Sequence, residues 1–93
     1  MNLKSKEADK LCKAILSLET MEQCYNFFED ICTIKEFQAM SQRLEVAQLL
    51  KERKTFSEIV EKTGASTATI SRVNKCLMYG AGGYGYVLDK LGE

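Results

Sequence analysis

The most restrictive feature of this sequence is how late its first helix-breaking residue occurs. The chain has 93 residues, contains no proline, and has no glycine before Gly64. Because proline and glycine are the two residues that most disfavour a helix interior, their absence leaves the first two thirds of the chain free to be helical. Apolar residues also recur every three or four positions, which is the period of an amphipathic helix. The length and this pattern predict one all-α domain.

Local signals divide this helical chain into six elements. A threonine followed three positions later by an acidic or amide residue has the spacing of a capping box, which marks a helix start. Three such pairs are Thr20 with Gln23, Thr33 with Glu36, and Thr55 with Glu58. They are expected to open the second, third and fourth helices, after a first helix over roughly residues 4–18. Gly64 is expected to end the fourth helix, Ser66 or Thr67 to begin a fifth that runs to about residue 78, and a short helix to close the chain.

The apolar faces of the first three helices are wider than a subunit of this size can cover. A tight helical core within one subunit is the simpler interpretation. Large uncovered apolar patches promote association, however, so we expect these helices to be buried against a second copy of the chain.

Composition narrows the possible functions. Thirteen basic and thirteen acidic residues give a net charge of zero, but residues 51–75 carry six basic and only three acidic residues. A basic segment on a neutral protein suits local contact with phosphates. The chain has no histidine, the commonest general base, and we expect neither a catalytic site nor a bound metal. No apolar run is long enough to span a bilayer, so we expect no membrane association and a cytoplasmic location.

Four widely spaced cysteines complete the composition. They are Cys12, Cys24, Cys32 and Cys76. Without paired C-x-x-C spacing they do not resemble a zinc site, and each lies among apolar residues. We expect them to act as small core residues in a reducing compartment.

The segment TFSEIVEKTGASTATISRVNK, from Thr55 to Lys75, has the plan of a helix-turn-helix. Inward packing is expected of its apolar residues, namely Phe56, Ile59, Val60, Ala65, Ile70, Val73 and Leu77. The opposite face of the second helix carries small, hydroxyl-bearing and basic side chains, which fit the major groove of DNA. The expected DNA-binding residues are Lys54, Ser57, Ser66, Thr67, Ala68, Thr69, Ser71, Arg72 and Lys75. The alternative is a helical hairpin with a solvated face, in a protein-interaction adaptor that does not bind DNA directly.

The run AMSQRLEVAQLLKERKTFSEIVEKTGASTATISRVNKCL resembles the tryptophan-repressor superfamily. Positions that match its signature are Leu49, Leu50, Gly64, Ala65, Ala68, Thr69, Ile70, Ser71 and Arg72. The ending VNKCLMYGAGGYGYVLDKL is closer to the YerC/YecD-like branch. The resemblance implies a six-helix, all-α subunit in an intertwined homodimer that represses transcription by sequence-specific binding to double-stranded DNA. Residues 1–52 would then be the dimerisation helices, 55–78 the helix-turn-helix, and 79–93 the glycine turn and last helix.

The same resemblance points to a corepressor site. In the repressor proper, two arginines sandwich a tryptophan; here the first aligns with Gln42, which is next to Arg43, and the second is Arg72. Val73 stands where the family has a glycine and would crowd an indole, and Cys76 replaces a serine. We therefore expect no cofactor, with tryptophan or a related small-molecule corepressor as the alternative.

The stretch GAGGYG, Gly80 to Gly85, reads as the G-x-G-x-x-G of a dinucleotide-binding loop. Such a loop follows a β-strand and precedes an acidic residue about twenty positions further on. This one follows a predicted helix, and fewer than twenty residues of the sequence follow it. We expect these glycines to end the fifth helix and turn the chain, with Tyr84 and Tyr86 anchoring the turn.

Overall fold

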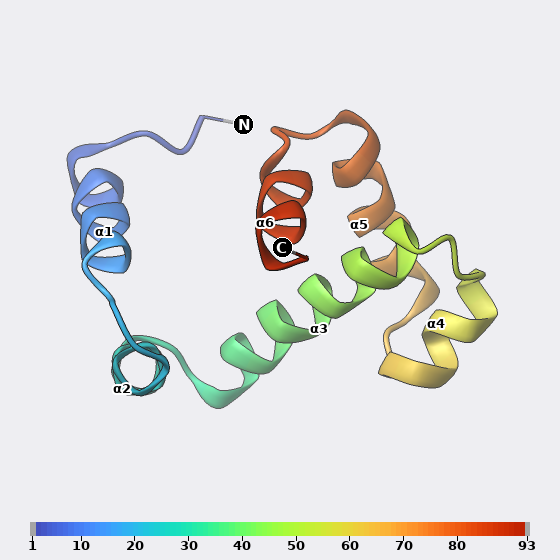
Figure 1. Ribbon diagram of the computed structural model, residues 1–93, viewed down its shortest axis with the longest axis horizontal. Helices are drawn as coiled ribbons and strands as arrows, with labels where there is room; N and C mark the ends of the chain where they lie inside the picture. The colour runs from blue at the N-terminus through green and yellow to red at the C-terminus, as the bar shows by residue number, and fades with distance from the viewer. Residues whose placement is uncertain (1, 93) are drawn as a thin grey trace. The chain divides into compact units, whose positions relative to one another are not determined.

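A computed structural model describes residues 2–92, and within that range it contains six helices and no strand (Figure 1). The helices are α1 (Lys6–Leu16), α2 (Met21–Ile31), α3 (Ile34–Lys51), α4 (Phe56–Thr63), α5 (Thr67–Tyr79) and α6 (Gly83–Leu91). The all-α architecture expected from the sequence is confirmed. None of these helices is long and apolar enough to cross a membrane.

Side-chain caps start the helices of the N-terminal part where the sequence predicts them. Thr33 Oγ1 accepts the Glu36 N–H at 3.1 Å, while a Glu36 carboxylate oxygen accepts the Thr33 N–H at 2.8 Å, which makes a complete capping box. Thr20 Oγ1 likewise accepts the Gln23 N–H. The Gln23 side chain, however, accepts from the Glu19 N–H rather than from Thr20, so this second predicted box is incomplete.

The chain forms two compact units, and residues up to Phe37 make up the first. It contains a cluster of aromatic rings: the ring centroid of Phe37 lies 5.6 Å from that of Phe28 and 6.3 Å from that of Tyr25. Neither α1 nor α2 has a buried residue in the single subunit. Their apolar faces are therefore largely uncovered; large exposed side chains there include Leu11, Ile15, Leu16, Met21 and Ile31.

The second unit, from Gln38 onward, holds the core. Its buried side chains come from α3, α4, the turn, α5 and α6, and they are Val46, Ala47, Leu49, Ile59, Ala65, Ile70, Val73 and Leu88. In Figure 1, α4 and α5 follow the C-terminal end of α3, and α6 lies next to α5. An ion pair between Lys51 and Asp89 links the end of α3 to α6. This core fixes the orientation of α5, the helix that carries most of the predicted site.

The cysteines differ in part from the expectation of core residues. All four are free thiols; Cys24 and Cys32 are half-buried, but Cys12 and Cys76 are exposed in the subunit. The prediction is therefore wrong for Cys12 and Cys76. Cys12 belongs to α1, which has no buried residue, and Cys76 lies on the flank of α5, where it lines an apolar hollow instead of joining Ile70 and Val73 in the core.

Candidate nucleic-acid interface

The first helix of the predicted helix-turn-helix begins with a complete capping box. Thr55 Oγ1 accepts the Glu58 N–H at 3.2 Å, and a Glu58 carboxylate oxygen accepts the Thr55 N–H at 3.1 Å. The helix ends at Gly64, whose φ of 72° is left-handed and whose N–H donates to the Val60 carbonyl. Only glycine adopts this conformation without a steric penalty, so the observed ends of α4 are those that the sequence predicts.

Thr63 organises the turn between α4 and α5. Its Oγ1 donates to the Ile59 carbonyl at 2.7 Å and accepts the Ala65 N–H at 3.1 Å. Its carbonyl accepts a hydrogen bond from Gln42 Nε2 at 3.2 Å. Gln42 belongs to α3, so this amide holds the turn against the long helix.

The two faces of α5 are divided as the sequence predicts. Ile70 and Val73 are 0% and 1% exposed, and Leu77 is half-buried against the same core. The exposed residues of α5 predicted to contact DNA are Thr67, Ala68, Ser71, Arg72 and Lys75. Thr69 differs from these because it is half-buried. Its Oγ1 accepts a hydrogen bond from the Ser66 hydroxyl at 3.1 Å, so Thr69 supports the turn beside the exposed face.

The start of α5 combines a side-chain cap with a lack of negative charge. Ser66 Oγ accepts the Thr69 N–H at 3.1 Å. The first turn of α5 has no acidic residue, whereas α1, α2, α3 and α4 each have at least one in their first turn. The partial positive charge of this helix end is therefore left unneutralised and can attract an anion.

Two of the residues of α4 that are expected to pack inward are instead partly exposed. Ile59 is fully buried, but Phe56 is 38% exposed and Val60 is 37% exposed. The expected inward packing is wrong for these two, because at 100° per residue both lie to one side of Ile59, the buried residue of this short helix. Lys54 and Ser57, both predicted to contact DNA, are exposed at the start of α4.

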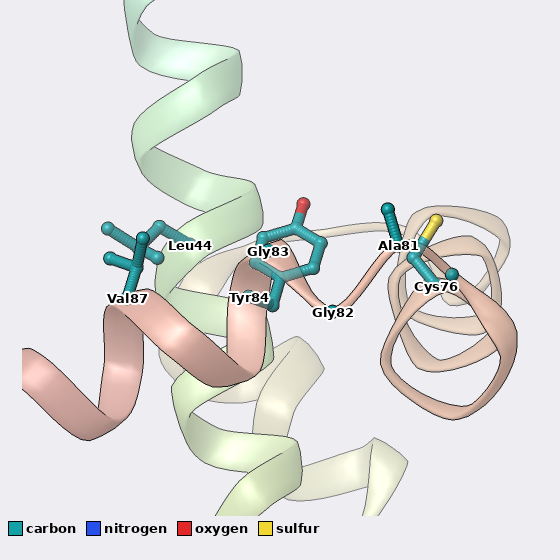
Figure 2. A pocket seen from close by; sticks show the side chains of 8 residues that line it. Leu44, Cys76, Ala81, Gly82, Gly83, Tyr84 and Val87 are labelled. Carbon is teal, nitrogen blue, oxygen red and sulfur yellow. The ribbon is translucent and has the colours of Figure 1, made fainter. Parts of the chain in front are cut away.

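Of the four candidate ligand residues, Cys76 lines an apolar hollow whose lining does not include the other three. Gln42 is engaged with the turn, Arg43 is half-buried and Arg72 is exposed. Cys76 instead lines an apolar hollow of about 450 Å³, with Leu44 and Val87 at one end and Ala81 beside Cys76 at the other (Figure 2). None of Gln42, Arg43 and Arg72 lines this hollow.

The glycine stretch joins two helices. Gly80 ends α5, its N–H donating to the Cys76 carbonyl at 2.9 Å, and Gly83 begins α6. Tyr84 is half-buried against the core, as expected of an anchor. Tyr86 is 68% exposed, with Lys90 Nζ 5.7 Å from its ring centroid, so the expectation that it anchors the turn is wrong.

A feature that sequence reasoning missed lies just before α4. Arg53 has a φ of 64°, the only positive value at a non-glycine residue among residues 2–92. The available signal was the absence of glycine where α3 must stop, ahead of the Thr55 cap.

Similar proteins are known. The family model described as Trp repressor protein matches residues 6–92. The uncharacterized protein YerC of Bacillus subtilis (strain 168) is 54% identical over 91 residues, covering 98% of this chain and 88% of YerC. The crystal structure of a TrpR-like protein from Eubacterium eligens has a TM-score of 0.94 and 54% identity, covering 97% of this chain and 93% of that one. A candidate Trp repressor from Staphylococcus aureus has a TM-score of 0.93 and 47% identity, covering 97% of this chain and 90% of that one.

Proposed function

Because this chain belongs to the Trp repressor family, whose members are DNA-binding regulators, we propose that it is a sequence-specific transcriptional repressor. In this proposal it acts in the cytoplasm as a homodimer on double-stranded DNA. A family of regulators gives no support to an enzymatic activity.

The observation that carries the proposal is the orientation of α5. Ile70 and Val73 fix one side of the helix in the core, which leaves Ala68, Ser71 and Arg72 exposed on the other. Small side chains allow a helix to approach base edges closely, hydroxyls can bond to bases or phosphates, and an arginine can make two hydrogen bonds to guanine. The Ser66-capped end of α5, with no acidic side chain in its first turn, supports a phosphate contact at the same surface.

Dimerisation is supported by what the subunit leaves uncovered. The apolar faces of α1 and α2 have no buried residue, although both helices are strongly amphipathic. A second copy that covers these faces would remove them from water and supply a second α5. Two such helices would enter successive major grooves about one helical turn apart, so we expect a pseudo-palindromic operator.

We further propose that tryptophan does not control DNA binding. Gln42 occupies the position where the repressor proper has its first arginine, and its amide donates to the Thr63 carbonyl. A ligand at this position would compete with a hydrogen bond that holds the helix-turn-helix. In this proposal, the hydrogen bond from Gln42 stabilises the helix-turn-helix without a corepressor.

Selection of bound fragments from the native genome, with and without added tryptophan, tests the proposal. We expect recovery of one shared pseudo-palindromic sequence, equally in both conditions and more weakly as salt rises. Retention of no fragment at any salt concentration would instead favour the protein-interaction adaptor. Recovery only in the presence of tryptophan would refute the assignment of Gln42 to a structural role.

A further inference from the structure

The end of α3 contains an unusual backbone conformation. The Lys54 N–H donates to the Leu49 carbonyl and the Arg53 N–H to the Leu50 carbonyl, both at 3.0 Å. This is the Schellman pattern, in which the residue in the left-handed conformation is usually glycine because a Cβ is unfavourable there. Here that residue is Arg53, with a φ of 64°. The subunit therefore accepts a conformational cost to keep an arginine at this position.

Among the residues that the structure describes, no interaction explains this arginine. Arg53 is exposed and has no ion-pair partner among residues 2–92. Its basic neighbour Lys51 is paired with Asp89. The nearby carboxylates are also engaged, since Glu52 accepts from Gln48 Nε2 at 2.7 Å and Glu58 completes the capping box of α4.

The position of Arg53 indicates a partner outside the subunit. It lies two residues before Thr55, the cap of α4, and next to the exposed Lys54. In a helix-turn-helix the first helix crosses the DNA backbone, so a cation at its start lies near phosphates. A guanidinium can form two parallel hydrogen bonds with a phosphate.

We propose that Arg53 is a DNA-phosphate contact, maintained at the expense of subunit stability. This inference rests on the proposed DNA-binding function. It distinguishes Arg53 from the residues on the exposed face of α5, because a phosphate contact adds affinity without adding sequence preference.

The test compares Arg53→Gly, Arg53→Lys and Lys90→Gln with the unaltered protein. Arg53→Gly relieves the backbone and removes the cation, so we expect its melting temperature to rise by about 2–6 °C. Its affinity for the selected DNA fragment should fall about tenfold per contact. The affinity for fragments with altered operator sequences should fall by the same factor. The slope of log affinity against log salt should fall by about 0.9 per contact, or about 1.8 for a dimer.

The other two variants separate charge from backbone conformation. Arg53→Lys keeps the cation and the strained backbone, so we expect an unchanged melting temperature and an unchanged salt slope. Lys90→Gln removes one positive charge from α6, outside the helix-turn-helix, and we expect its affinity to stay within about twofold of the unaltered protein and its salt slope to be unchanged.

Three outcomes would overturn the inference. If Arg53→Gly keeps the full affinity and slope while the unaltered protein selects its fragment, Arg53 makes no phosphate contact and the proposed function stands. If Lys90→Gln lowers the slope equally, the effect is one of net charge. If the unaltered protein retains no DNA, the proposed function and the inference both fail.

Discussion

The strongest test of the geometry at the end of α5 is the substitution Gly80→Ala. A Cβ at Gly80 would lie 2.4 Å from the Cys76 carbonyl oxygen and 3.1 Å from the Cys76 carbonyl carbon and Cα, whereas real Cβ contacts stay above 3.0 Å. The φ of −83° and ψ of −160° at Gly80 are open to other residues, so the penalty is steric. The obstacle is helix backbone, which cannot rotate away as a side chain can.

Relief of this contact requires the last turn of α5 to open. The hydrogen bond from the Gly80 N–H to the Cys76 carbonyl would be lost, which costs about 0.5–1.5 kcal/mol, and displacement of packed neighbours adds to it. We therefore expect Gly80→Ala to lower the free energy of unfolding by about 1–3 kcal/mol. Gly85→Ala is the matched control, because its Cβ would meet nothing within 4 Å inside α6. That substitution should raise the free energy of unfolding by about 0.5–1 kcal/mol.

The free energy of unfolding of both variants is measured by urea denaturation, monitored by far-UV circular dichroism. All measurements use one protein concentration, because association changes apparent stability. The reasoning is refuted if Gly80→Ala lies within about 0.5 kcal/mol of the unaltered protein while its m-value is unchanged. That result would mean that the loop finds another conformation at little cost.

Three further substitutions test the core, the DNA-binding face and a helix cap. Ile70→Ala removes a fully buried side chain and should lower the free energy of unfolding by about 2–5 kcal/mol in the same denaturation assay. Arg72→Ala should weaken operator binding about 10- to 100-fold in a gel-shift titration while the dimer stays folded; unchanged binding would refute the assignment of the exposed face. The hydrogen bonds from the Thr33 N–H and hydroxyl lower the pKa of Glu36 below its ordinary 4.5, so its stabilisation is present above that value and is lost as pH falls through the lowered pKa. Glu36→Gln should therefore flatten the acid side of a plot of melting temperature against pH, and an unchanged plot would contradict this.

Local interactions were the part of the structure most accessible from the sequence. The boxes at Thr33 and Thr55 and the stop at Gly64 depend on residues within four positions of one another, so the pattern alone located them. The burial of Ile70 and Val73 followed from helical periodicity.

Contacts between helices that are distant in the sequence could not be predicted from the sequence. The Gln42–Thr63 hydrogen bond joins residues 21 positions apart, and nothing near Gln42 in the sequence indicates it. Resemblance placed Gln42 among the ligand candidates, whereas the structure shows it bonded to the turn. Tyr86 was expected to anchor the glycine turn, but its side chain is exposed on α6.

The hydrogen bond from Gln42 to Thr63 also has a consequence for regulation. If a repressor needs a small molecule to set the angle of its DNA-contacting helix, its DNA binding follows the concentration of that molecule. Here a residue of the chain itself holds the turn. In the proposed function, occupancy of the operator would then follow how much of the protein the cell makes, and control would pass from metabolite supply to synthesis and turnover of the repressor.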